Sequence, residues 1–153
     1  MIRRAEERDI PRLIALLEQV NRVHHEGRPD LFRPGTKYGA EDLKGILANE
    51  NTPVFVYEDG GGVAGYAFCQ IQRHPADRLL TDAAACYIDD LCVDESMRGR
   101  GIGRQLFEYV CAWAKEQGCY HVTLNVWCLN PGAMKFYESL GMKPMKIGME
   151  TIL

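Results

Sequence analysis

The chain has 153 residues, which is the length of one domain and enough to bury a substantial core. Its formal net charge is −3 and its pI is near 5.8, with 46% hydrophobic and 25% charged residues. This balance disfavours a protein that binds nucleic acid or a membrane surface as a whole. We expect a single α/β domain over residues 1–153, with no nucleic-acid or membrane partner.

The N-terminal residues MIRRAEERDI carry charge but no apolar stretch typical of a signal peptide, and no apolar run approaches the ~18 residues of a membrane span. A cytoplasmic location is therefore predicted. The six cysteines form no CxxC pair, and most lie in apolar patterns where cysteine behaves as a small hydrophobic residue. We expect reduced thiols and no metal site.

The N-terminal part of the chain predicts one strand and two helices. Residues 2–5 could form a short edge strand. Asp9 suits a helix N-cap and Pro11 is tolerated in a first turn, and apolar residues then recur every three or four positions to about residue 24. A Gly-Arg-Pro-Asp stretch interrupts this pattern, and a second helix is expected over residues 40–48.

The remainder of the chain alternates strand and helix patterns. The expected elements are strands over 54–57 and 63–73 joined by a glycine-rich turn, a strand over 84–93, a helix over 101–117, a strand over 121–127, a helix over 131–140 and a last strand pair over 143–153. The complete order is βααβββαβαββ. It predicts a mixed, partly parallel sheet of about seven strands with helices on both faces.

Residues 98–104, RGRGIGR, are the most distinctive stretch of the sequence. Their glycine spacing fits neither the GxGxxG dinucleotide motif nor the GxxxxGK[ST] phosphate loop. An RNA-binding RGG segment would be repeated, whereas this stretch occurs once, between a strand and a helix. Gly101 and Gly103 would let the backbone approach a ligand, and the free N–H groups of the helix N-terminus favour an anion. The stretch therefore predicts a phosphate cradle.

Three segments resemble the GNAT superfamily of N-acetyltransferases over essentially the whole chain. Residues 98–103, RGRGIG, match the [QR]-x-x-G-x-[GA] motif that holds the pyrophosphate of acetyl-CoA in that family. Residues 88–93, IDDLCV, resemble its central strand, and residues 130–142, NPGAMKFYESLGM, resemble its N-x-x-A-x-x-x-Y-x-x-x-G-[FM] segment. The resemblance implies an acetyl-CoA-dependent acyltransferase whose sheet is splayed between its fourth and fifth strands.

The resemblance also implies which residues hold acetyl-CoA. The pantetheine arm would bond to the backbone of Leu91 and Val93, and the N–H of Cys92 or Val93 would serve the oxyanion. Asn130 would contact the coenzyme and can also cap the helix that starts at Pro131. The full set of expected coenzyme-binding residues is Leu91, Cys92, Val93, Arg98, Gly99, Arg100, Gly101, Ile102, Gly103, Arg104, Asn130 and Tyr137.

Acetyl transfer to an amine needs an acid and a base, because an amine with a pKa near ~10 must lose a proton and the leaving thiolate must gain one. The resemblance makes Tyr137 the acid and Asp89 the base, acting through water; alternatively, Asp89 binds a cationic substrate. Asp89 and Asp90 are consecutive in a strand, so they are expected on opposite faces of the sheet. No base is placed beside Cys92 or Cys128, so direct transfer in a ternary complex is preferred over a covalent cysteine intermediate.

The acceptor is expected to be the primary amine of a small molecule. Candidate acceptor-binding residues are His24, Arg28, Asp30, Phe32 and Asn125, with Trp127 and the loop over residues 74–78 as further candidates. The alternatives are a protein N-terminus or lysine as acceptor, a coenzyme A-binding sensor without turnover, and an RNA-binding module. A homodimer formed through the exposed last strand is also open.

Overall fold

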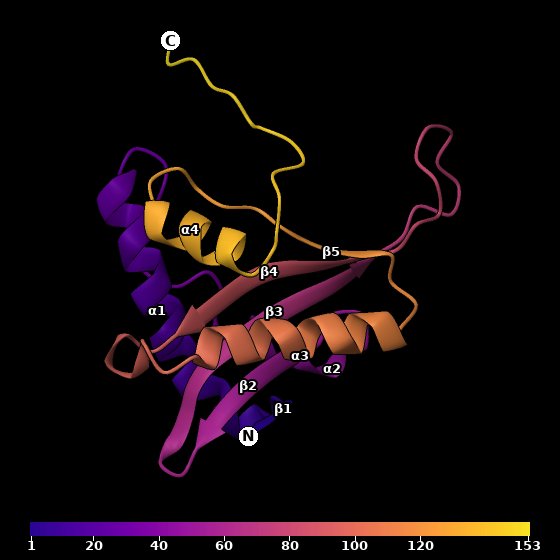
Figure 1. Cartoon of the computed structure of the whole chain (residues 1–153). Helices are drawn as coiled ribbons and strands as arrows, with labels where there is room; N and C mark the ends of the chain where they lie inside the picture. Colours follow the sequence, from indigo (N-terminus) through magenta and orange to yellow (C-terminus); the bar gives the residue numbers. More distant parts are fainter.

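A computed structural model describes residues 1–153 and places a five-stranded sheet between helices (Figure 1). The elements in chain order are β1 (Ile2–Arg4), α1 (Ile10–Gly27), α2 (Ala40–Ala48), β2 (Val54–Asp59), β3 (Gly62–Gln72), β4 (Ala85–Val93), α3 (Ile102–Glu116), β5 (His121–Leu124) and α4 (Pro131–Ser139). Short 3-10 turns precede α1 and α3. All four predicted helices are confirmed to within a few residues.

The strands lie side by side in the order β1-β2-β3-β4-β5. The first three pairings are antiparallel, and β5 is parallel to β4 because α3 crosses between them. Helices cover both faces of this mixed sheet, as expected for an α/β domain. None of the helices combines the length and the apolar composition that a bilayer crossing requires.

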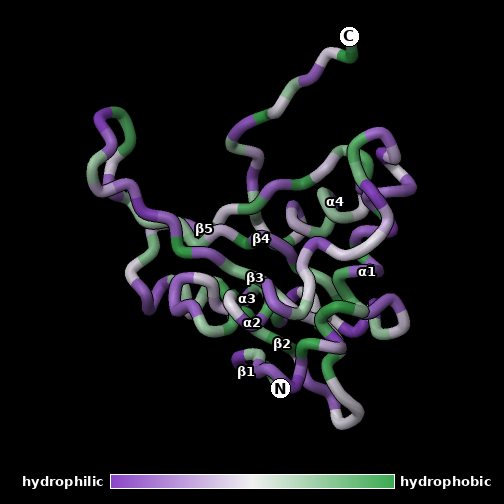
Figure 2. Tube along the Cα trace, turned by 180° about the vertical axis from the view of Figure 1, so that it is seen from behind, coloured by the Kyte–Doolittle hydropathy of each residue, from purple (hydrophilic) through white to green (hydrophobic).

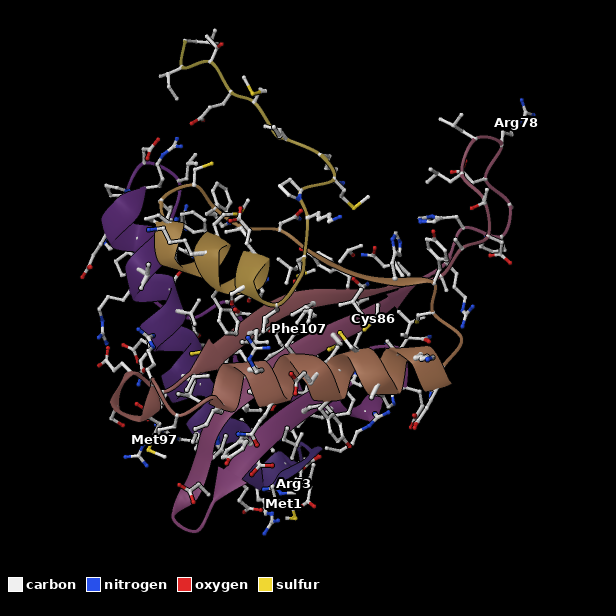
Figure 3. The ribbon with its side chains drawn as sticks, viewed as in Figure 1. Met1, Arg3, Arg78, Cys86, Met97 and Phe107 are labelled. Carbon is white, nitrogen blue, oxygen red and sulfur yellow. The ribbon has the colours of Figure 1, made fainter.

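Each face of the sheet has its own apolar core. On one face, the apolar sides of α1 and α2 pack on Val54, Val56, Tyr66, Phe68 and Cys92. On the other face, α3 packs Phe107, Val110 and Ala114 on alternate residues of β2, β3 and β4. Figure 3 shows Phe107 beside Cys86 in this second layer. The two cores hold β4 between them, and β4 carries the acidic pair predicted for the site.

A bulge in β4 overturns the expectation that Asp89 and Asp90 face opposite sides of the sheet. Phe68 pairs with Asp90 and Cys69 pairs with Ile88, so Asp89 has no opposite residue on β3. The extra residue re-aims the side chains at this point. Both carboxylates therefore lie on the face covered by α1 and α2, where Tyr38 and Tyr66 reach them.

The sheet opens beside the bulge. Pairing of β4 with β5 runs only from Ala85 opposite His121 to Ile88 opposite Leu124. The strand predicted to reach residue 127 therefore ends at Leu124. Beyond Ile88, the last part of β4 continues without a partner on this side, so its backbone is available to a ligand.

The expected strand pair over 143–153 is absent, so the sheet has five strands rather than seven and the order βααβββαβαββ is wrong in its last two strands. Gly141, at φ +92°, ends α4, and the chain then leaves the domain as an extended tail (Figure 1). The alternating apolar pattern of the tail is that of a strand, but a strand forms only where a second strand supplies hydrogen bonds. Within one chain the tail has no such neighbour.

Candidate active site

The glycine-rich loop begins at a fixed carboxylate that directly follows β4. Asp94 accepts hydrogen bonds from the backbone N–H and the hydroxyl of Ser96, each at 3.0 Å, and pairs with Arg12 of α1. The backbone N–H of Ser96, and then the Arg12 guanidinium and the Ser96 hydroxyl, lower the pKa of Asp94 to about 2. The loop is therefore tied to α1 at its entrance.

Two glycines give the loop its shape. Gly99 and Gly101 have φ of +79° and +77°, a conformation that favours glycine, and no atom lies within 4 Å of the position where a side chain would start. Gly101 is the N-cap of α3 and offers no side-chain cap, so the first N–H groups of α3 remain available to an anion. This loop shape is compatible with the predicted phosphate cradle, and phosphate binding itself stays a prediction.

The other residues of the glycine-rich stretch 98–104 have different structural roles, and not all of their side chains are free to contact a ligand. Ile102 is buried in the core, so only its backbone can contact a ligand. Gly103 faces Phe136, whose ring would lie 3.0 Å from an added Cβ, so this glycine serves the packing of α4 on α3. The Nε–H of Arg98 donates to the Val93 carbonyl at 3.3 Å, and Arg104 pairs with Glu108.

Arg100 lines a separate hollow of about 650 Å³, which is also lined by Arg3, Arg8 and the β2–β3 turn. The lining of this hollow does not contain the acidic pair or Tyr137. We therefore place the candidate active site by its side chains rather than by this hollow.

The acidic pair is held by side chains from two segments, the connection before α2 and strand β3. Asp89 accepts from the Lys37 ammonium at 2.9 Å and from the Tyr38 hydroxyl at 2.6 Å. Asp90 accepts from the Tyr66 hydroxyl at 2.9 Å. Burial raises the pKa of Asp90 to about 6, which the hydrogen bond from Tyr66 and the charge of Lys37 only partly oppose. A carboxyl with this pKa can accept and release a proton near neutral pH.

Tyr137 of α4 lies near enough to Asp90 and Cys92 for their charges to act on its hydroxyl. It is partly buried beside Phe136 and makes no hydrogen bond within the chain. Burial, followed by the charges of Asp90 and Cys92, raises the pKa of Tyr137 well above its usual value, so the hydroxyl keeps its proton at neutral pH. Asn130 caps the same helix by accepting from the Ala133 N–H at 3.2 Å. Its predicted cap role is confirmed, and its contact with coenzyme stays a prediction.

The expected acceptor residues divide into two groups. The rings of His24, Phe32 and Trp127 form one aromatic cluster, with 5.0 Å between the centroids of His24 and Phe32 and also between those of Phe32 and Trp127. Burial lowers the pKa of His24, and the charge of Lys37 lowers it further. Asn125 donates to the Tyr87 hydroxyl at 3.2 Å.

Arg28 and Asp30 do not join this cluster. Arg28 pairs with Asp30 at 2.8 Å and with Glu150 of the tail, so these two residues satisfy each other at the surface. The loop over 74–78 projects from the opposite end of β4, with Arg78 near its tip (Figure 3). It is not brought together with the other acceptor candidates.

Sequence reasoning missed the two side chains that engage Asp89. Lys37 and Tyr38 lie in the connection before α2, whose sequence has no apolar periodicity that would indicate where its side chains point. Tyr66 lies in a predicted strand, but no local sequence pattern indicates that its hydroxyl would contact Asp90. These contacts depend on the tertiary fold.

The sequence matches a known family. Residues 17–142 match the model of the acetyltransferase (GNAT) family, which is most of the chain. The same range contains the glycine-rich loop, the acidic pair and Tyr137.

Individual relatives agree with this match. A glucosamine 6-phosphate N-acetyltransferase from Trypanosoma brucei brucei is 33% identical over 60% of this chain, and the streptothricin acetyltransferase of Streptomyces lavendulae is 32% identical over 70%. The matched segments cover only 58% and 52% of those two proteins. The crystal structure of a mutant of the BH1408 protein from Bacillus halodurans is 32% identical, with a TM-score of 0.96 over 100% of this chain and 99% of that one. The chain belongs to the acetyltransferase (GNAT) family.

Proposed function

We propose that this protein is an acetyl-CoA-dependent N-acetyltransferase that transfers the acetyl group directly to the primary amine of a small molecule. One observation carries the proposal. The unpaired end of β4 runs from the acidic pair towards the glycine-rich N-terminus of α3, and the charges of Asp90 and Cys92 on this part of β4 act on Tyr137. This arrangement supports a site in which a phosphate cradle, an exposed strand backbone, an acid and a base act together.

The residues of the loop fit acetyl-CoA. The left-handed glycines at 99 and 101 leave open space beside the N-terminus of α3, which suits a pyrophosphate. We assign the phosphate contacts to the backbone of Gly101, Ile102, Gly103 and Arg104, and the pantetheine contacts to the backbone of residues 91–93. When bound, acetyl-CoA supplies the acetyl group as an activated thioester. Asn130 is a further proposed contact.

We assign proton donation to Tyr137 and proton acceptance to the acidic pair. Tyrosine is protonated at neutral pH, and burial raises the pKa of Tyr137 further, so its hydroxyl carries a proton that it can donate. Asp90, with a pKa of about 6, is ionised at neutral pH and can take a proton from the acceptor directly or through water. Asp89 is already bound to Lys37, so we give it the role of ligand for the acceptor's ammonium group, alongside the base role that its position in the family motif implies.

Direct transfer is supported by the state of Cys92. Burial raises the pKa of this thiol to about 12, so it is not a thiolate at neutral pH and is a poor nucleophile. The backbone N–H groups of Cys92 and Val93 are the proposed donors to the developing oxyanion.

A small, primary amine is the favoured acceptor class. The Lys37 ammonium is itself a primary amine, and its contact with Asp89 provides an example of how such a group can bind there. The cluster of His24, Phe32 and Trp127 would flank the rest of the acceptor. The names of the two relatives, which specify glucosamine 6-phosphate and streptothricin, also point to small amines.

A coupled thiol-release assay tests the proposal. The purified protein is incubated with acetyl-CoA and a panel of amino sugars, diamines, aminoglycosides and lysine-bearing peptides, and binding of acetyl-CoA is followed separately by thermal stabilisation. We expect stabilisation together with acceptor-dependent thiol release for a small amine. Stabilisation without release from any amine would indicate a binding protein, and release with peptides alone would overturn the acceptor class.

A further inference from the structure

Lys37 places a primary amine on the acidic pair of the candidate active site. Its Nζ lies 2.9 Å from a carboxylate oxygen of Asp89, and its charge also acts on Asp90. Of the six lysines in the chain, Lys37 alone forms an ion pair with a residue of this site, whereas Lys44 pairs with Glu41 of its own helix. The chain therefore already holds, at the proposed acceptor position, the kind of group that the proposed reaction acetylates.

The residue next to Lys37 fixes its backbone against β4. The Tyr38 ring packs on Phe68 of the core, with 5.8 Å between the two ring centroids. The Tyr38 hydroxyl donates to Asp89 at 2.6 Å, so ring and hydroxyl together anchor this point of the chain. The Lys37 ammonium also lies over the Tyr38 ring, 5.6 Å from its centroid. Lys37 is thus directed to the acidic pair by a neighbour that is itself bound there.

The connection that carries this lysine, residues 28–39, is tied to α1 at two points. The Asn21 side-chain amide donates to the Arg33 carbonyl at 2.8 Å, and the Nδ1 atom of His25 lies 2.7 Å from the Phe32 carbonyl oxygen. Figure 2 shows the molecule from the side of the sheet opposite to α3, with the two helices α1 and α2 that this connection joins. The segment is therefore ordered, and α1 sets its position.

The amine of Lys37 keeps some freedom within this ordered segment. Its side chain is 46% exposed, and an ion pair this exposed is weak, so the amine readily leaves Asp89. The unpaired part of β4, which is the proposed path of the acetyl-bearing arm, begins at the same aspartate. Groups positioned together in one molecule reach effective concentrations of ~10⁵–10⁸ M, so an amine tethered beside a thioester competes strongly with free amines.

We propose that the protein acetylates its own Lys37 and that this modification releases Asp89 for an external acceptor. The inference rests on the proposed function, because it uses the same site and the same acetyl donor. Before modification, the Lys37 ammonium occupies the carboxylate that an acceptor ammonium needs. Acetylation turns the amine into a neutral amide, which ends the ion pair. Lys37 thus acts first as an internal acceptor and then, once modified, as an uncharged wall of the acceptor site.

The step balances without any further reactant. The Lys37 nitrogen forms a C–N bond to the acetyl carbon, and the C–S bond of the thioester breaks. Lys37 begins as an ammonium and ends as an amide with one N–H, so it gives up two protons. Asp90 passes one of them to solvent, and the other balances the proton that Tyr137 donates to the departing sulfur. The products are the acetylated chain and free coenzyme A.

A pair of substitutions tests the consequence for the acceptor. Lys37→Arg keeps a permanent charge on Asp89 and cannot be acetylated in this way, whereas Lys37→Gln is neutral and resembles acetyl-lysine. We expect complete labelling to lower the acceptor KM of the parent roughly 2–5-fold, to the value of Lys37→Gln. The KM of Lys37→Arg should be the same before and after incubation with acetyl-CoA. An unchanged KM in the fully labelled parent would overturn the release of Asp89.

The mass of the intact chain and peptide mapping, after incubation with acetyl-CoA alone, test the modification itself. We expect one acetyl group per chain, on Lys37, at a rate that does not depend on protein concentration, and the same labelling in the surface control Lys44→Arg. Labelling of Lys37 no faster than that of Lys44 in the parent would overturn the proposal.

The thiol-release assay with added amines separates this inference from the proposed function. Release with a small amine but no label on Lys37 would overturn the inference and leave the proposed function intact. A label on Lys37 without release by any amine would support the inference and count against a small-molecule acceptor. Absence of both would overturn both.

Discussion

The Tyr66 hydroxyl donates a 2.9 Å hydrogen bond to Asp90, and this bond joins the hydrophobic core to the candidate active site. Tyr66 is fully buried between α1 and the sheet, and Asp90 follows the β4 bulge. Burial of the carboxyl raises its pKa to about 6, and the bond from Tyr66 limits the rise. The protein thus keeps an acid where its charge is unfavourable for folding, which is a common feature of functional sites.

The first prediction is that Asp90→Asn stabilises the fold at neutral pH. The pKa of Asp90 is higher in the folded chain than its ordinary value of 3.8, so the folded state favours the protonated form. The resulting cost is absent below about pH 4, grows as the pH rises, and is complete above about pH 6, where it is on the order of 1–3 kcal/mol. Asparagine removes the charge but still accepts the hydrogen bond from Tyr66. Thermal melts should therefore show a higher Tm for the variant at pH 8 and little difference at pH 4.

Asp89→Asn is the matched control for this measurement. Asp89 accepts hydrogen bonds from Lys37 and Tyr38, so removing its charge breaks a favourable ion pair and does not relieve an unfavourable buried charge. We expect this variant to be no more stable than the parent at pH 8. If both variants gained the same stability, the cost would not belong to Asp90.

The second prediction concerns the pH dependence of turnover. If Asp90 accepts the proton, kcat/KM must rise with pH as Asp90 ionises, with an apparent pKa of about 6 in the free enzyme. The ionisable neighbours of Asp90 are Asp89, Lys37, Tyr66 and Tyr137, of which Lys37 and Tyr66 lower its pKa. The profile is measured with the best acceptor from the panel. Asp90→Asn should lose this limb together with ~10²–10⁴-fold of kcat/KM, and an unchanged limb in that variant would remove Asp90 from the mechanism.

The sequence predicted local features of this site well. The N-terminus of α3 at Gly101 and the cap of α4 at Asn130 follow from short-range rules, because a left-handed glycine and a capping side chain act on their immediate neighbours. The amphipathic helices were also correct, since their apolar periodicity is a property of each segment alone.

Features that depend on a second segment were not predictable in the same way. The bulge at Asp89 exists only in the register of β4 against β3, and no local pattern encodes that register. The contact of Lys37 with Asp89 joins residues that are far apart in sequence. The tail over 143–153 has a strand's alternation, yet it is not a strand, because strand formation requires a partner that one chain does not provide.

The third prediction compares two glycines at opposite ends of α3. Gly101 and Gly118 have nearly the same backbone conformation, with φ of +77° and +79°, and open space around each. Valine at either position is strained by a similar amount, about 1–2 kcal/mol or more. Only Gly101→Val should also weaken binding of acetyl-CoA, measured by calorimetry on the folded variants. Equal affinity in the two variants would contradict the cradle assignment.

The fourth prediction is that Lys37→Met lowers the KM for the acceptor. The Lys37 ammonium lies 2.9 Å from Asp89 and competes with an acceptor ammonium for that carboxylate. Methionine keeps much of the apolar stem but removes the charge. Lys44→Met is the control, because Lys44 pairs with Glu41 on the surface of α2. An unchanged KM in Lys37→Met, or an equal fall in both variants, would mean that the acceptor does not use Asp89.

The fifth prediction tests the acid. Tyr137→Phe removes a hydroxyl that makes no hydrogen bond within the chain, and it leaves the packing of the ring beside Phe136 intact. The fold and the affinity for acetyl-CoA should therefore be unchanged. If this hydroxyl donates the proton during transfer, kcat should fall by ~10²–10⁴-fold while the KM for acetyl-CoA stays close to that of the parent. Tyr109→Phe, on the exposed side of α3, is the matched control and should retain full activity. Parental kcat in Tyr137→Phe would show that protonation comes from solvent, because the hydroxyls of Tyr38 and Tyr66 already donate to the acidic pair.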